Sequence, residues 1–109
     1  MAYNEELAER MRRILNGRKD VREKKMFGGI GFLVNGNMAC GVNKQDLILR
    51  MSEGEFERAL KHPYARIFDM TGKPMKGWIL ISAEGYKSDK TLGDWIEKGI
   101  AFAKSLPPR

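Results

Sequence analysis

The sequence predicts an α+β fold, a two-layer sandwich in which helices cover one face of an antiparallel sheet. Apolar residues recur at helical spacing near both ends of the chain, and short alternating runs broken by turn residues fill the stretch between them. Such helices and such a sheet each have an apolar side that must be covered, and packing them together covers both. With 109 residues and one cysteine, we expect a single domain, 1–109, with a core that needs no disulfide.

Three segments have the pattern of amphipathic helices. The first is predicted over 4–16, with Asn4 as its N-terminal cap. A short second helix should follow Ser52 and end before Pro63, because the residue preceding proline disfavours helical backbone. The third is predicted over 89–106. Each apolar stripe can pack on the same sheet face.

Between these helices the pattern predicts strands. A long first strand over 22–34 is interrupted by Gly28-Gly29, which indicates a bulge or a sharp coil. Two shorter strands follow it in a meander, and strands over 64–70 and 78–83 complete a five-stranded sheet in the order α-β(3)-α-β(2)-α. Alternation places two sets of residues each on one strand face: Met38, Cys40 and Val42, and Leu47, Leu49 and Met51.

Several motifs follow one another in a distinctive order. The segment 25–32 reads Lys-Met-Phe-Gly-Gly-Ile-Gly-Phe, a hairpin turn at 35–37 leads to Met-Ala-Cys-Gly-Val at 38–42, and the segment 73–78 and Trp95 come later. This combination resembles the TfoX/Sxy N-terminal domain family over nearly the whole chain. Its structural motif comprises Met26, Phe27, Gly28, Gly29 and Gly31. A phosphate-binding loop is the weaker interpretation of these glycines, because a strand follows them where that loop needs a helix.

The resemblance implies a fold shared with secretion-chaperone-like domains, which agrees with the predicted order of elements. It also implies a link to bacterial regulators of natural competence, which act with a transcription factor of the cyclic-AMP receptor type. Those regulators carry a second, C-terminal domain, and this chain resembles their N-terminal half. The family brings no catalytic residues. We therefore expect a non-enzymatic regulatory or adaptor domain that acts by protein–protein association and is linked to transcription regulation.

Positive charge is concentrated in one segment. The whole chain has a net charge of +6, and the segment 10–25 alone has eight basic and two acidic residues. The alternative function is therefore a nucleic-acid-binding module that uses this segment. The candidate contacts with nucleic acid or an acidic partner are Arg12, Arg18, Lys19, Arg22, Lys24 and Lys25. A solvated basic loop is the competing interpretation, and we expect Arg10 and Arg13 to pair with Glu6 and Glu9 four residues earlier.

A second candidate surface is a partner face formed by Met70, Met75 and Trp78, since methionine and tryptophan are common at adaptable interfaces. Plain core packing is the alternative. An open sheet also leaves edges and a partly wet face, through which we expect a homodimer. No segment is apolar and long enough to enter a membrane, and the N-terminus lacks the pattern of a secretory signal, so we expect a cytoplasmic protein.

A small uncharacterised enzyme is the third hypothesis. Cys40 falls on the apolar side of a predicted strand, where a thiol behaves as a small buried hydrophobe. His62, the only histidine, precedes a proline at a helix end. One cysteine and one histidine without ligand spacing do not predict a zinc site or a nucleophilic pair. We expect no catalytic residues, no metal and no cofactor.

Overall fold

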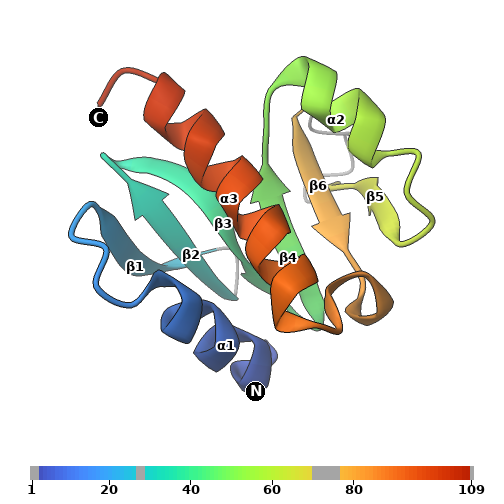
Figure 1. Cartoon of the computed structure of the whole chain (residues 1–109), viewed down its shortest axis with the longest axis horizontal. Helices are drawn as coiled ribbons and strands as arrows, with labels where there is room; N and C mark the ends of the chain where they lie inside the picture. The colour runs from blue at the N-terminus through green and yellow to red at the C-terminus, as the bar shows by residue number, and fades with distance from the viewer. Residues whose placement is uncertain (1–2, 27–28, 70–76, 109) are drawn as a thin grey trace.

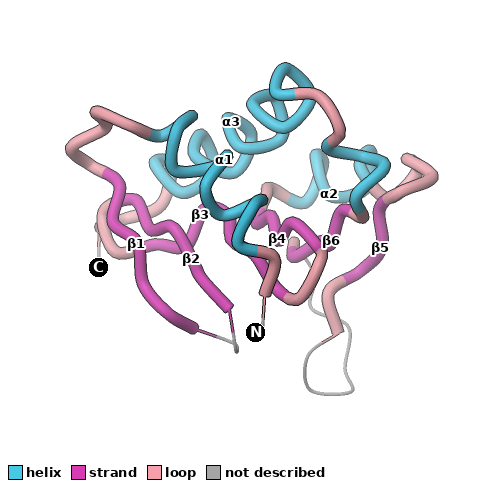
Figure 2. The backbone as a smooth tube through the Cα atoms, turned by 90° about the horizontal axis from the view of Figure 1, so that it is seen from below, coloured by secondary structure: helices cyan, strands magenta, loops and turns pink. Residues whose placement is uncertain are grey.

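The computed structural model describes residues 3–26, 29–69 and 77–108. Three helices lie on one face of a six-stranded antiparallel sheet, as Figures 1 and 2 show from two directions. The predicted α+β two-layer architecture is confirmed. The elements in chain order are α1 (Glu5–Leu15), β1 (Val21–Met26), β2 (Gly29–Val34), β3 (Asn37–Asn43), β4 (Asp46–Arg50), α2 (Glu53–Ala59), β5 (Ala65–Ile67), β6 (Trp78–Ile81), the 3₁₀ turn η1 (Ala83–Tyr86) and α3 (Asp89–Ser105).

The strands lie in the order β1-β2-β3-β4-β6-β5, and every neighbouring pair is antiparallel. The first four strands form a continuous meander. The chain then passes through α2 to the far edge, where it forms β5, and returns as β6 between β5 and β4. The edge strands are therefore β1 and β5, at opposite ends of the sheet in Figure 2.

The predicted single strand over 22–34 is wrong, because β1 and β2 are separate strands that pair with each other. The described sheet therefore has six strands in the order α-β(4)-α-β(2)-α, not the predicted five in the order α-β(3)-α-β(2)-α. Lys25 faces Ile30 and Met26 faces Gly29 across the β1–β2 ladder, so β1 and β2 run antiparallel. Phe27 and Gly28 of the predicted motif lie outside the described residues. Gly29 opens β2, and a Cβ there would lie 1.9 Å from the carbonyl oxygen of Val42. Glycine at this position permits a close approach of β3 rather than a bulge within one strand.

The helix ends follow the sequence signals closely. The Asn4 side chain accepts a hydrogen bond from the Leu7 amide at 3.1 Å and caps α1 as predicted. Ser88 caps α3 in the same way by accepting from the Thr91 amide at 3.0 Å. The α2 helix is short, and it ends before Pro63.

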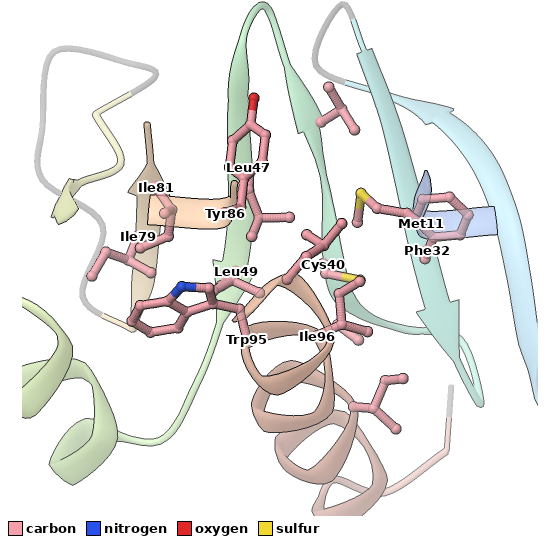
Figure 3. Packing of buried hydrophobic residues seen from close by; sticks show 14 of the residues in the cluster. Met11, Phe32, Cys40, Leu47, Leu49, Ile79, Ile81, Tyr86, Trp95 and Ile96 are labelled. Carbon is pink, nitrogen blue, oxygen red and sulfur yellow. The ribbon is translucent and has the colours of Figure 1, made fainter. Parts of the chain in front are cut away.

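The main core lies between the sheet and the helices. Figure 3 shows Trp95 and Ile96 of α3 and Met11 of α1 among the buried residues of this core. As predicted, the side chains of Leu47, Leu49 and Met51 all belong to this cluster.

The prediction that Met38 shares a face with Cys40 is wrong. Phe32 faces Cys40 and Leu33 faces Met38, so Ala39 is an extra residue in β3 at this bulge. An extra residue reverses the alternation of side chains beyond it. Cys40 and Val42 consequently belong to the main core, whereas Met38 lies in a separate buried cluster with Ile48, Phe68 and Leu80.

Candidate functional site

The outer strand β1 is the most open part of the described sheet. It is six residues long and pairs with β2 alone among the described strands. Arg22, Glu23, Lys24 and Lys25 are all exposed, so both faces of this strand are accessible. The opposite edge strand β5 has three residues and closely follows Pro63. An edge that is short and flanked by proline offers little backbone for pairing, so β1 is the available edge.

Some basic residues of the segment 10–25 form ion pairs with acidic residues of the domain, and the first of these is Arg10. Arg10 of α1 binds Asp89 at 3.1 Å and donates to the backbone carbonyl of Tyr86 at 2.9 Å. Its guanidinium also lies 5.7 Å from the centroid of the Tyr86 ring. Arg10 therefore joins α1 to η1 and the start of α3, and the predicted pairing with Glu6 is wrong.

Arg12 connects α1 to β1. Its Nε and Nη2 atoms donate to the two carboxylate oxygens of Glu23, each at 2.8 Å, and its Nη1 donates to Glu9. The hydrogen bond from Arg12 lowers the pKa of Glu23 below its ordinary value, against the opposing effect of partial burial. Glu9 binds Arg12 rather than the predicted Arg13.

Two further ion pairs fix the connection between α1 and β1 to the last helix. Arg18 pairs with Glu97, and Lys104 pairs with Asp20 at 3.4 Å. Arg12 and Arg18, two of the six predicted contact residues, are therefore engaged within the domain. The two acidic residues of the segment 10–25, Asp20 and Glu23, are engaged as well.

A distinct set of cations is left without an ion pair among the residues that the structure describes. These residues are Arg13, Lys19, Arg22, Lys24 and Lys25. We call the three on the strand, Arg22, Lys24 and Lys25, the β1 cations. Strand geometry places Arg22 and Lys24 on the face away from the helices, and Lys25 on the face of Glu23. Of the six predicted contact residues, Lys19 and the β1 cations are therefore those without an ion pair among the described residues.

A groove between α2 and α3 was not predicted from the sequence. Two open pockets of about 320 and 260 Å³ share Glu55 and Lys98 as lining residues. Glu55 binds Arg58 at 2.5 Å and Lys98 at 3.2 Å, and hydrogen bonds from these two cations lower its pKa. A carboxylate held in its charged form by two cations is a poor general acid. The groove depends on a pairing between helices far apart in sequence, so no local pattern indicates it.

Cys40 and His62, considered for the enzyme hypothesis, lie in different surroundings. Cys40 is completely buried in the main core (Figure 3), and burial raises the pKa of its thiol to about 12. His62 lines the smaller pocket, with its ring centroid 5.6 Å from that of Trp95. Over the described ranges, no three side chains of the His, Cys, Asp and Glu types are gathered to hold a metal ion.

The predicted partner face is only partly described. Trp78 packs against the second buried cluster, with its ring centroid 6.3 Å from that of Phe68. The Arg50 guanidinium lies 5.3 Å from the centroid of the Trp78 ring. Trp78 therefore contributes to packing within the domain, as the competing interpretation expected, while Met70 and Met75 lie outside the described residues.

The architecture defines a small α+β domain, with one sheet face under three helices and one long basic edge. The model of the TfoX N-terminal domain matches residues 13–103, and the chain belongs to this family. The predicted family is thereby confirmed. Comparisons with curated proteins and with solved structures find no significant match. Within residues 3–26, 29–69 and 77–108, no helix is long and apolar enough to cross a membrane.

Proposed function

We propose that this domain is a non-enzymatic regulatory or adaptor module that acts by binding another protein. Membership of the TfoX N-terminal domain family supports this proposal, because the resemblance to competence regulators implies a link to transcription regulation. The observation that carries the proposal is the open strand β1, with exposed side chains along 22–25 and no neighbour on its outer side among the described strands. Unpaired backbone groups on a strand of this length are a common basis for protein association.

The surrounding structure supports a binding role for this edge because it holds β1 in place. Arg12 fixes Glu23 from α1, while Arg18 and Lys104 join the preceding connection and α3. A strand whose position is fixed before binding loses less conformational entropy when a partner arrives.

The proposal is tested by isolating a partner and rebuilding the complex from purified components. The tagged chain is cross-linked in its source cells, the enriched protein is expressed separately, and the mixture is analysed by size-exclusion chromatography with light scattering. We expect a complex with a defined stoichiometry. If no enriched protein forms a complex with the purified chain, the adaptor function is contradicted.

Nucleic-acid binding is the second candidate, favoured by the β1 cations, which form no ion pair within the described part of the chain. Duplex DNA and RNA are titrated into the domain at low and high salt, with Lys19→Glu/Lys24→Glu as the variant. Binding through phosphate contacts weakens steeply with salt. Tight, salt-sensitive binding that the variant abolishes would favour this function over the adaptor.

A further inference from the structure

We propose that β1 binds an extended acidic segment of a partner protein, which pairs with it as a seventh strand of the sheet. The inference rests on the proposed function of protein association, and it specifies the surface and the chemistry of the partner. It combines two observations about β1: its outer backbone edge has no neighbour among the described strands, and its cations form no ion pair with a described residue.

The backbone of β1 is suited to strand addition. Its inner side forms a regular antiparallel ladder with β2, in register from Val21 with Val34 to Met26 with Gly29. In such a ladder, alternate residues direct their N–H and C=O groups toward the neighbour, and the others direct theirs to the opposite side. On β1 this opposite side has no neighbouring strand in the described part of the chain. An extended peptide could hydrogen-bond to those groups in the same geometry.

The charges on β1 select for an acidic peptide. Arg22 and Lys24 lie on one face and Lys25 on the other, so an added strand would meet cations on both of its faces. Acidic side chains opposite these cations would form favourable cross-strand pairs. Glu23, the one acidic residue of β1, is bound by Arg12 on both carboxylate oxygens, which reduces its repulsion of an acidic peptide.

Other occupants fit this edge less well. A second copy of the chain would bring the β1 cations of the two molecules together, and like charges opposite each other destabilise a strand pair. Duplex nucleic acid needs cations gathered on one surface, whereas the β1 cations point to both faces of a single strand. Tyr64, an exposed aromatic residue, precedes β5 at the other end of the sheet, so it cannot stack bases bound near β1.

The test uses a fluorescent peptide of alternating Glu and Thr, six residues long like β1. A Lys/Thr peptide of equal length is the charge control, and a Glu/Thr peptide with a central proline is the control for strand pairing. We expect the wild-type domain to bind the Glu/Thr peptide at least about tenfold more tightly than either control. Similar affinity for the Glu/Thr peptide and the proline peptide would overturn strand addition.

Two variants with equal changes in net charge locate the site. Arg22→Glu/Lys24→Glu reverses two β1 cations, and Lys61→Glu/Lys87→Glu reverses two exposed lysines away from β1. We expect the affinity of the first variant for the Glu/Thr peptide to fall by about tenfold or more, and its affinity for the Lys/Thr peptide to rise. The second variant should retain the wild-type preference for the Glu/Thr peptide. Equal weakening by both variants would overturn the assignment to β1.

Hydrogen exchange then tests the geometry directly. On saturation with the Glu/Thr peptide, amide exchange within 21–26 should slow, and exchange at α2 should not change. Binding that leaves the β1 amides unaffected would overturn the inference. If the purified partner of the adaptor test binds wild type and Arg22→Glu/Lys24→Glu equally, this inference fails while the proposed function stands. If no partner forms a complex, the proposed function itself fails.

Discussion

Arg12 holds Glu23 through two parallel hydrogen bonds of 2.8 Å, from one guanidinium to both oxygens of one carboxylate. This pair joins the first helix to the edge strand β1. Its two residues are eleven positions apart in the chain. Because the two side chains neutralise each other, neither adds to the net charge around β1. The positive charge that remains lies on β1 itself and on the neighbouring residues Arg13 and Lys19.

Replacing Arg12 by alanine should loosen β1 without unfolding the domain. Both side chains of the pair with Glu23 are more than a third exposed, so solvent screens their attraction and the global loss should be no more than about 1 kcal/mol. We expect faster amide exchange across 21–26 in Arg12→Ala. The control is Arg13→Ala, which removes an exposed arginine of the same helix without an ion pair among the described residues. Equal exchange in the two variants would show that the pair does not hold β1.

The same pair predicts a pH dependence of stability. Because Arg12 lowers the pKa of Glu23 in the folded state, the pair contributes stability above the ordinary carboxyl pKa of 4.5 and loses it as pH falls through the lowered value. The difference in unfolding free energy between wild type and Arg12→Ala should therefore shrink on acidification. Urea titrations at several pH values measure it, and a difference that grows toward acid would contradict this sign.

Gly99 permits a close contact between α3 and β3. A Cβ at this position would lie 2.3 Å from the carbonyl oxygen of Ala39, the extra residue of the β3 bulge. Gly99→Ala should therefore destabilise the domain by about 1–3 kcal/mol, because backbone atoms must move. Gly93→Ala in the same helix meets nothing within 4 Å and should be neutral or stabilising by up to about 1 kcal/mol, from helix propensity. Thermal unfolding compares the two, and equal melting temperatures would disprove the close contact.

Cys40 should be inert in the folded protein. Its thiol is buried and its pKa is raised to about 12 from an ordinary value near 9, so at neutral pH almost no thiolate is present. Alkylation should proceed only as fast as the domain opens, and it should accelerate sharply in denaturant. Because the folded state retains the proton, stability should be unaffected by this group below pH 9 and should fall as pH rises from about 9 toward 12. Rapid alkylation of the native chain at neutral pH would contradict this burial.

Local signals predicted the helices and the apolar face of β4 well. The cap at Asn4, the strand turn at 35–37 and the end of α2 before Pro63 all depend on residues close in sequence. Chemistry of this kind acts within one turn of backbone, so the sequence shows it directly.

The errors arose where distant segments determine the outcome. Strand register or helix packing determines three of these features: the close approach of β3 to Gly29, the extra residue Ala39, and the pairing of Arg10 with Asp89. Register moves whole sets of side chains between faces, and no short pattern specifies it. The sequence shows that positive charge is concentrated in the segment 10–25, but only the structure separates Arg12 and Arg18, which form ion pairs, from the β1 cations.

The most direct test of the account is amide hydrogen exchange of the free domain, measured together with its sedimentation at the same concentration. If β1 is an open edge, alternate amides within 21–26 exchange rapidly, while those of β3 and β4, in the interior of the sheet, are protected. The predicted homodimer is compatible with this result only if the two copies meet elsewhere, for example at the sheet face away from the helices. Uniform protection along β1 in a sedimenting dimer would mean that a second copy already covers this edge, and it would contradict the proposed binding site.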